Sequence, residues 1–309
     1  MSIELVRIAT RESPLASWQA NHVRTELLKL YPGLTVELIS IKTQGDIILD
    51  TPLSAVGGKG LFIKELEQTL LDNTADIAVH SMKDVTIDLP TGLELAVIMK
   101  REDPRDVFIS NHYQRLIDLP QGACVGTSSL RRQCQLRACR PDLVVKDLRG
   151  NVGTRLRKLD KGEYDAIVLA AAGMIRLQLE NQVKEYLSED IMVPAVGQGA
   201  IGIETRQDDR EIINILKPLN DPVTTIQLQA ERAFSRRLYG GCQLPIAAYA
   251  EISGDDIFMS GLVGSVDGKR IIKDGVAGKI NEPGLLGTQL AEKLLDQGAD
   301  EILQELIHD

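Results

Sequence analysis

The sequence repeats one short pattern: an apolar strand, a turn that carries serine or threonine, and then a helix. One copy runs from LVRIAT through Ser13 and Pro14 into SWQANHVRTELLKLY, and another runs from ACVGT into SSLRRQCQLRACR. Serine is a favoured helix N-cap, and proline is favoured in the first helical turn. Because an apolar strand follows each helix, the repeat predicts βαβ units with parallel strands.

The order of the segments predicts an α/β fold. ADIAVHSM and AIVLAAAG are nearly continuous apolar runs, typical of parallel strands buried on both faces. The charged segment KREDPRD interrupts the pattern and indicates a boundary between two α/β units, whose cleft is the default ligand site. After residue 222, a helix, the segments IAAYAEI, IFMSGLVGSV and KRIIKDGVAG, and one final helix over 284–307 indicate a small α+β domain with an antiparallel meander.

The first helix has an apolar stripe. Leu15, Trp18, His22, Val23 and Leu27 fall on neighbouring turns of this helix. A stripe of this kind is typical of a helix that covers a sheet, so we expect these side chains to face the strands.

The composition limits the partners that we expect. A formal net charge of −9 argues against a general affinity for nucleic acid or anionic membrane. The N-terminus shows no basic region followed by a long apolar core, and no apolar run has the length of a membrane span. We therefore expect a soluble, cytoplasmic protein. No coiled coil or long exposed apolar stripe is apparent, and a monomer is expected.

The four cysteines form no close pairs, which argues against a disulfide framework or a zinc site. Cys124, Cys134 and Cys139 lie among apolar and helical positions and are expected to be small buried hydrophobes. Cys242 differs, because the two glycines before it remove side-chain cover and favour an exposed loop. The four histidines are widely spaced, so no metal site is expected.

Two glycine motifs match nucleotide-binding sequences only by letter. Residues 197–202, GQGAIG, fit GxGxxG, but IGIETR alternates like a strand where that motif needs a helix. GGKG at residues 57–60 fails the P-loop pattern, because Gly60 stands where serine or threonine is required. It is better interpreted as a mobile loop able to close over a site.

Arginine beside helix N-termini is the stronger functional signal. Unpaired backbone N–H groups, hydroxyls and guanidinium forks together suit carboxylates or phosphates. The residues placed in this way are Arg11, Ser13, Thr127, Ser128, Ser129, Arg131, Arg132, Arg149, Arg155 and Arg176. Cations are disfavoured in the first turn of a helix, so a ligand role is expected for Arg131 and Arg132. Arg137 and Arg140 are expected on a solvated helix face.

Residues 80–84, HSMKD, end a buried strand, the position where α/β sheets present functional side chains. Asp84 is the better catalytic candidate, because a carboxylate among arginines stays ionised and stabilises a cationic intermediate. A surface ion pair between Lys83 and Asp84 is the plainer alternative. His80 falls within the apolar alternation and is expected to be a satisfied core histidine.

Ten segments, in order over almost the whole chain, resemble porphobilinogen deaminase. They are TRESPLA, KTQGD, GGKGLFIKELE, HSMKDV, REDPRD, GTSSLRRQCQL, LRGNVGTRL, LAAAG, PAVGQGAIGIE and GGCQLPIAAYA. The resemblance implies two α/β domains similar to periplasmic binding proteins and a small C-terminal α+β domain with the cofactor cysteine. It places residues 1–99 and 200–217 in domain 1, residues 105–193 in domain 2 and residues 222–309 in domain 3.

The resemblance implies a transferase of tetrapyrrole and haem biosynthesis. Such an enzyme condenses four porphobilinogen molecules head to tail, loses ammonia at each step and releases hydroxymethylbilane by hydrolysis. The implied cofactor is a dipyrromethane primer, joined to Cys242 by a thioether. Because each pyrrole carries acetate and propionate groups, the growing chain is a polycarboxylate, which suits the arginines described above.

The resemblance also implies roles for individual residues. Asp84 is implied as the catalytic group that stabilises positive charge on pyrrole nitrogens, and Lys59 as part of a lid. The implied cofactor-binding residues, besides Cys242, are Lys83, Ser129, Arg131, Arg132, Arg155, Thr127 and Asp46. The implied substrate-binding residues are Arg11, Ser13, Gln19, Arg149, Arg176 and Gln198. The departures from the family's usual residues, none at an assigned charge, are Thr86, Tyr239, Ala247 and Ala248.

Two other classes of function use the same features. One is a non-catalytic protein that binds or senses organic anions in a two-lobed cleft, and the other is an enzyme that acts on anionic sugars or phosphates. A binding protein needs neither Asp84 nor Cys242. These two residues therefore separate the transferase from its main rival.

Overall fold

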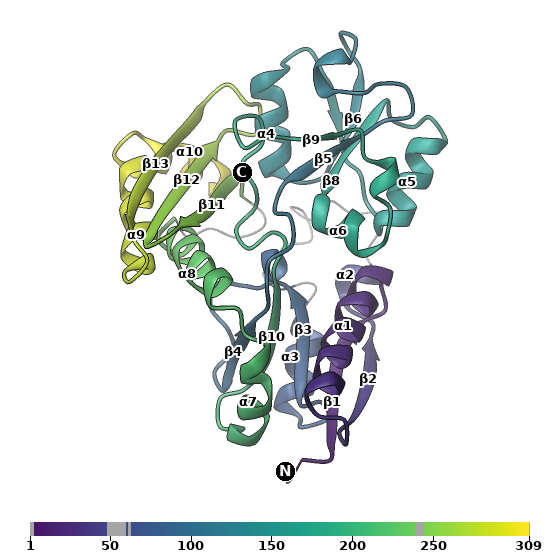
Figure 1. Cartoon of the computed structure of the whole chain (residues 1–309). Coiled ribbons are helices and arrows are strands. Elements are labelled where there is room, and N and C mark those ends of the chain that lie inside the picture. Colours follow the sequence, from purple (N-terminus) through teal and green to yellow (C-terminus); the bar gives the residue numbers. More distant parts are fainter. Residues whose placement is uncertain (1–2, 48–59, 61–62, 239–243, 309) are drawn as a thin grey trace. The chain divides into compact units, whose positions relative to one another are not determined.

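The computed structural model of the chain describes residues 3–47, 60, 63–238 and 244–308 (Figure 1). The chain divides into two units, and each is described by itself. The first contains the described residues of 1–49, 58–102 and 200–225, and the second those of 103–199 and 226–309. The chain leaves the first unit at the KREDPRD segment and returns to it near residue 200. The division into three domains stays a prediction.

The first unit is built on a five-stranded sheet in the order β2-β1-β3-β10-β4. Its elements are β1 (Leu5–Arg11), α1 (Pro14–Leu30), β2 (Thr35–Ile41), α2 (Gln44–Ile47), α3 (Lys64–Leu71), β3 (Ile77–Ser81), the 3₁₀ turn η1 (Met82–Asp84), β4 (Leu93–Ile98), β10 (Ile201–Arg206), α7 (Arg210–Leu216) and the 3₁₀ turn η4 (Lys217–Leu219). Strands β1, β2 and β3 are parallel, which confirms the predicted βαβ opening. Strand β10 lies antiparallel between β3 and β4, so GQGAIG leads into a strand as expected.

Helix α1 begins where its sequence predicts. The Ser13 hydroxyl accepts the Ala16 N–H at 3.3 Å, and Pro14 occupies the first turn. This cap satisfies one of the backbone donors that a helix leaves unpaired at its start.

The face that α1 buries is only partly the predicted one. Its buried residues are Ala16, Gln19, Ala20, Val23 and Leu27. Leu15, Trp18 and His22 are half-buried instead, and the rings of Trp18 and His22 stack with their centroids 5.1 Å apart. The small alanines let the helix approach the sheet closely, which leaves the larger side chains at its flanks.

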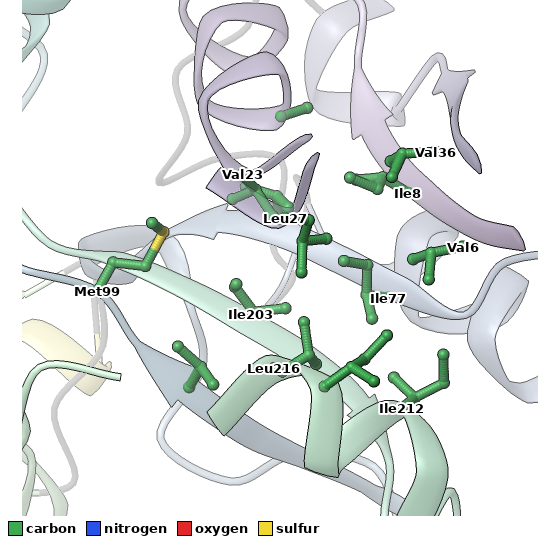
Figure 2. Close-up of a cluster of buried hydrophobic side chains, with 14 of the residues drawn as sticks. Val6, Ile8, Val23, Leu27, Val36, Ile77, Met99, Ile203, Ile212 and Leu216 are labelled. Atoms are coloured by element: carbon green, nitrogen blue, oxygen red, sulfur yellow. The ribbon is translucent and has the colours of Figure 1, made fainter. Parts of the chain in front are cut away.

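The sheet of the first unit is covered on both faces. On one face, α1 and α7 pack over Ile8 and Ile77, as Figure 2 shows. On the other face, α3 places Leu66 and Leu70 against the strands. This arrangement confirms the prediction that β3 is buried on both sides, and it explains its nearly continuous apolar sequence.

The second unit contains another five-stranded sheet, in the order β7-β6-β8-β5-β9. Its elements are β5 (Asp106–Ile109), the 3₁₀ turn η2 (Leu116–Asp118), β6 (Cys124–Gly126), α4 (Leu130–Cys139), β7 (Val144–Lys146), α5 (Val152–Asp160), β8 (Ala166–Ala170), α6 (Ala171–Arg176), the 3₁₀ turn η3 (Glu180–Gln182) and β9 (Glu185–Tyr186). Strands β6, β7 and β8 are parallel, which confirms the second βαβ pattern. Helix α4 packs on one face through Leu136, and α5 and α6 pack on the other through Leu156 and Met174.

The chain ends in a three-stranded antiparallel sheet, β11-β12-β13, which confirms the predicted meander and the small α+β part. The elements here are α8 (Pro222–Arg237), β11 (Ile246–Ser253), β12 (Asp256–Gly264), β13 (Ile271–Lys279), α9 (Pro283–Leu295) and α10 (Ala299–His308). The prediction of one final helix is wrong, because Gly298 separates α9 from α10. Its φ of +94° is left-handed, a conformation that ends helices and that glycine adopts without strain.

None of the helices in the described part of the chain is long and apolar enough to cross a bilayer.

Gly287 of α9 is expected to tolerate no side chain. A Cβ at this position would lie far inside van der Waals distance of the Ala230 backbone oxygen in α8. A backbone oxygen cannot give way unless a helix shifts. We expect Gly287→Ala to lower the free energy of unfolding of the second unit by about 1–3 kcal/mol, the usual cost of overpacking.

Gly284→Ala is the matched control on the same helix, because a Cβ there meets nothing within 4 Å. Its Tm should stay unchanged or rise slightly, since alanine favours helices more than glycine does. Calorimetry suits the comparison, because the single tryptophan, Trp18, lies in the first unit. Equal melting of the two variants would contradict the close packing of α8 and α9.

Candidate functional site

The first unit has a pocket at the edge of the sheet where β1 and β3 end. Five of the predicted site residues line it: Arg11, Ser13, Gln19, Lys83 and Asp84. The other lining residues are Leu15, Ala16, Ile63, Val79, His80 and Ser81. Two cationic side chains, a carboxylate and a helix N-terminus therefore converge on one pocket. The set suits a small ligand that carries groups of both charges.

Helix α1 forms one wall of this pocket. Arg11 is the last residue of β1, and Ser13 caps α1 two residues later, so one short turn presents both. Gln19 lies one and a half turns into the helix and is 2% exposed. Its Nε2 donates to Ser81 Oγ at 2.8 Å. The Gln19 amide thus ties α1 to the end of β3, next to the predicted catalytic residue.

The η1 turn forms the charged wall. The Met82 N–H donates to Ala200 O at 3.0 Å, which fixes the start of the turn to the residue before β10. The Met82 side chain is buried against Gly202, where a Cβ would clash with its sulfur. Lys83 and Asp84 follow this anchor and are half-buried in the pocket lining.

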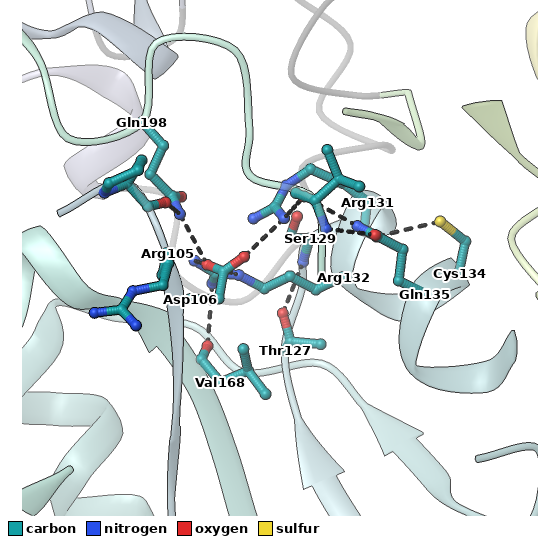
Figure 3. Close-up of polar contacts among 12 residues, drawn as sticks. Arg105, Asp106, Thr127, Ser129, Arg131, Arg132, Cys134, Gln135, Val168 and Gln198 are labelled. Atoms are coloured by element: carbon teal, nitrogen blue, oxygen red, sulfur yellow. Dashed lines mark hydrogen bonds and ion pairs between the residues drawn. The ribbon is translucent and has the colours of Figure 1, made fainter. Parts of the chain in front are cut away.

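The second unit contains a buried cluster of one carboxylate and two guanidinium groups (Figure 3). Asp106 Oδ2 accepts from Arg131 Nη1 at 2.7 Å, and Asp106 Oδ1 accepts from Arg132 Nη2 at 2.7 Å and Nε at 3.0 Å. Backbone carbonyls add to the cluster, because Arg131 Nη1 also donates to Val193 O and Arg132 Nη1 to Val168 O. The first turn of α4 is thereby tied to β5, to β8 and to the segment around Val193.

This cluster has a net positive charge. Burial by itself raises the pKa of Asp106, but the charges of Arg131 and Arg132 and their hydrogen bonds outweigh burial and hold it well below its usual range. Burial lowers the pKa of Arg132, yet arginine keeps its proton in proteins. Two guanidinium charges against one carboxylate leave one positive charge in excess. A ligand carboxylate would complete the neutralisation.

Gln198 and the residues that enter α4 surround the cluster. Gln198 is buried, and its Nε2 donates to Pro104 O at 2.6 Å and to Asp106 Oδ1 at 3.0 Å. The buried Thr127 accepts the Ser129 N–H on its Oγ1 at 3.2 Å, which shapes the turn before the helix. Ser129 occupies the N-cap position, as predicted, but its hydroxyl makes no capping hydrogen bond.

The remaining predicted arginines also lie at element ends of the second unit. Arg149 lies between β7 and α5, and Arg155 in α5 donates from Nε to Gly150 O at 2.8 Å. Arg176 ends α6, is 6% exposed and donates from Nη2 to Gly199 O at 2.6 Å. The structure thus places the predicted residues in two groups, one at the pocket of the first unit and one in the second unit.

Arg137 and Arg140 do not form the solvated face expected of them. Arg137 Nη1 donates to Val266 O at 2.7 Å, and Arg140 pairs with Asp142 through two hydrogen bonds of 2.6 and 2.8 Å. Guanidinium groups reach backbone carbonyls and carboxylates several residues away, so both side chains join α4 to neighbouring segments.

The cysteines near α4 differ in exposure. All three were expected to be buried, and Cys134 is. Cys124 is only half-buried, and Cys139, the last residue of α4, is exposed.

Three predictions concern parts of the chain about which the structure says nothing. Lys59 and Cys242 lie outside the described residues, and so does the side chain of Asp46. The lid and the covalent attachment therefore stay predictions.

Sequence reasoning missed Asp106 and Ser81. Asp106 opens the strand DVFI, whose four residues are all buried, so its carboxylate needed a cationic partner. The buried acid and the two adjacent arginines later in the chain were the sequence signal from which this cluster could have been predicted. Ser81 is the last residue of a buried apolar strand, and nothing in its local sequence pointed to Gln19.

The fold and the two groups of residues define an α/β protein with charged side chains and helix N-termini at its strand ends. Residues 6–214 match the family model of porphobilinogen deaminase, dipyromethane cofactor binding domain. Residues 225–296 match that of porphobilinogen deaminase, C-terminal domain. The chain therefore belongs to the porphobilinogen deaminase family.

Membership defines the activity in outline. The chain condenses porphobilinogen onto a dipyrromethane cofactor in tetrapyrrole biosynthesis, which is hydroxymethylbilane synthase activity. The family and the cofactor predicted from the sequence motifs are both confirmed.

Several solved structures are similar to part of the chain. A nutrient binding protein from Burkholderia cenocepacia bound to methionine shares 15% identity at a TM-score of 0.45, over 70% of this chain and 92% of that chain. The aliphatic sulphonate binding protein SsuA from Escherichia coli shares 15% identity at 0.42, over 76% and 70%. The BvgS periplasmic VFT2 domain from Bordetella pertussis shares 17% identity at 0.41, over 69% and 85%.

Removal of the Asp106 charge should destabilise the second unit strongly. Asp106→Asn keeps the shape but leaves two buried guanidinium groups without a counter-ion, which costs about 3–5 kcal/mol. The Asp106 carboxyl has a pKa below that of the unfolded chain, about 3.9. Its contribution is therefore fully present above pH 4 and is lost only as the pH falls further toward the folded-state pKa.

Calorimetric Tm values between pH 5 and 8 should accordingly show a large, constant loss for Asp106→Asn. Asp118→Asn, which breaks the exposed pair with Arg115, should melt close to the wild type. A small loss for Asp106→Asn, or one equal to that of the control, would mean that the cluster is not what stabilises this unit.

Proposed function

We propose that the chain joins four porphobilinogen molecules head to tail, releases ammonia at each step and frees hydroxymethylbilane by hydrolysis. The primer in this proposal is a dipyrromethane attached to Cys242 through a thioether. One observation carries the proposal: Asp84 lies in one pocket with Arg11, Lys83 and the Ser13 end of α1. The pocket offers positive groups for the carboxylates of porphobilinogen and one carboxylate for the positive charge that its reaction develops.

In this proposal, the negative charge of the Asp84 carboxylate stabilises positive charge that develops on the substrate during the reaction. In each condensation the bond between the aminomethyl carbon and its nitrogen breaks, and ammonia leaves. The carbon then joins a pyrrole carbon of the acceptor, which loses a proton. Positive charge develops on the nitrogen of the incoming pyrrole when ammonia leaves, and on the nitrogen of the acceptor pyrrole when the new bond forms. An ionised carboxylate close to these nitrogens lowers the barrier.

The positive cluster of the second unit fits the acidic groups of a dipyrromethane. The bound dipyrromethane supplies the pyrrole carbon that receives the first unit. The excess positive charge beside Asp106 would be neutralised by one of its acetate or propionate groups. We assign cofactor carboxylates to Lys83, Thr127, Ser129, Arg131, Arg132 and Arg155, with Asp46 nearby.

The remaining assignments concern the incoming substrate and the growing chain. They are Arg11, Ser13, Gln19, Arg149, Arg176 and Gln198, with Lys59 on a lid. We further propose that the protein acts in the cytoplasm as a monomer without nucleic-acid or membrane partners. The net charge of −9 supports the last point, because it opposes binding to polyanionic surfaces.

Replacement of Asp84 tests the chemical role. Asp84→Asn is expected to fold, since the half-buried side chain is no part of the core, and to lose at least about 100-fold in turnover of porphobilinogen. Asp208→Asn is the control, because this exposed carboxylate belongs to the same unit and lies outside the pocket lining. Intact-mass measurement shows whether each variant carries the primer. Turnover by Asp84→Asn at a rate near that of the control would refute the role.

Replacement of Cys242 tests the attachment. The purified wild type should exceed its sequence mass by one dipyrromethane, and Cys242→Ala should show the bare mass. Cys139→Ala, which removes an exposed thiol, should keep the added mass. If Cys242→Ala still carried the adduct, the attachment would lie elsewhere.

A further inference from the structure

Three buried titratable side chains of the first unit have no part in the reaction proposed above. Glu67 lies in α3, His80 in β3 and Glu204 in β10, and each is less than one-tenth exposed. His80 Nε2 and Glu204 Oε2 are 2.9 Å apart. The register of β3 and β10 places the side chains of His80 and Glu204 on the same sheet face as Ala78. This is the face that α3 covers. The three elements therefore enclose one polar cluster.

This cluster must hold protons. The hydrogen bond between His80 and Glu204 needs one proton, whichever of the two groups donates. Glu67 Oε1 and Glu204 Oε1 are buried and make no hydrogen bond with any described residue, an arrangement that is costly for two ionised carboxylates. Burial, followed by the charge of Glu204, raises the pKa of Glu67 to about 7. Glu67 thus carries a proton at mildly acidic pH.

Among the described residues, few charged groups face Glu67. Lys64 on the same helix is exposed and, like His80, lowers the pKa of Glu67 less than burial raises it. The residues of β1 and β4 that pack against α3 are the apolar Ala9 and Leu93. On β1, Arg11 lies in the pocket and Arg7 pairs with Asp76, as does Arg206 at the end of β10. On β4, Glu94 follows Leu93, so its side chain lies on the sheet face opposite α3. Within the described residues, no group of His, Cys, Asp or Glu could hold a metal ion.

The cluster lies directly behind the wall that carries Asp84. His80 precedes Asp84 by four residues along β3 and η1, and it belongs to the pocket lining. Ile63, the residue before α3, also lines this pocket. The chain just before β10 accepts the hydrogen bond that fixes the start of η1. A shift between α3, β3 and β10 would therefore move Asp84.

We infer that Glu67, His80 and Glu204 form one buried ionisable cluster that positions the η1 turn, and that loss of a proton from Glu67 above neutral pH slows the condensation. The inference rests on the role proposed for Asp84. Once Glu67 ionises, two buried carboxylates repel one another across the contact between α3 and β10. Displacement of a reacting group by about 1 Å can cost about 100-fold in rate, so a small shift suffices. The three side chains are positioning residues.

Glu67→Gln is the decisive variant, because glutamine copies the size of the protonated carboxyl and cannot ionise. We expect the wild-type kcat to fall through a limb near pH 7 and the Glu67→Gln kcat to lack this limb, with KM little changed in both. At pH 8.5 the variant should be several-fold faster than the wild type. Asp72→Asn removes an exposed carboxylate at the end of the same helix and should keep the wild-type profile.

Glu204→Gln removes the charge that His80 contacts. It should lower kcat by about 10- to 100-fold with little change in KM, because it displaces the η1 turn and Asp84 but removes no contact to the ligand. If Glu204→Gln fails to fold, Glu67→Gln still decides the question.

A second measurement is independent of activity. The folded-state pKa of Glu67 lies above its unfolded value of about 4.3. Its stabilising contribution is therefore fully present below pH 4.3 and is lost as the pH rises through 7. The Tm of Glu67→Gln minus that of the wild type, followed by Trp18 fluorescence, should grow between pH 5 and 8.

The outcomes separate the inference from the proposed function. If the wild type forms product but Glu67→Gln keeps the wild-type limb and a constant Tm difference, the inference is wrong and the proposed function stands. If the wild type forms no product, the proposed function fails, and the Tm difference alone then decides whether Glu67 holds a proton in the folded state.

Discussion

The second unit depends on one buried interaction, the carboxylate of Asp106 held between the guanidinium groups of Arg131 and Arg132. Removal of three charges from water costs several kcal/mol for each, and only close attraction with well-aligned hydrogen bonds offsets that cost. These bonds fix the first turn of α4 against β5 and β8. Through Gln198 they also hold the segment that leads along the chain to β10. Because the charges do not cancel, the element that orders this unit also carries one positive charge in excess.

Both units place their candidate residues at the same topological position. In the first unit, β1 and β3 are parallel. β1 ends at Arg11, and β3 leads into the η1 turn that ends at Asp84. In the second unit, β6 and β8 are also parallel. β6 leads into α4, whose first turn holds Arg131, and β8 leads into α6, which ends at Arg176. A helix that follows a parallel strand starts at the carboxyl edge of the sheet, so backbone N–H groups gather there. The repeated turn in the sequence thus explains why helix N-termini and candidate residues lie together at the strand ends of both units.

Local sequence signals were enough to predict most helices and strands. They were not enough to predict which residues pair with the buried charges. The cap at Ser13 and the alternation in IGIETR each depend on a few adjacent residues, and both were predicted correctly. The break at Gly298 was missed because an isolated glycine inside a helical pattern is compatible with either outcome. His80 is a satisfied core histidine, as expected, but its partner Glu204 is 124 residues away. That pairing depends on the antiparallel insertion of β10 beside β3, and no local pattern specifies which strand returns to a sheet.

The two buried charge clusters differ in how they respond to pH. Arginine keeps its proton, and the pKa of Asp106 lies well below its usual range, so the charge of the second-unit cluster is constant near neutrality. The first-unit cluster contains Glu67, which titrates near pH 7. Ligand carboxylates also stay ionised in this range, so their attraction to the arginines does not vary with pH. If Asp84 and the arginines have the proposed roles, pH should therefore act on the chemical step through the η1 turn and leave the binding of carboxylates almost untouched.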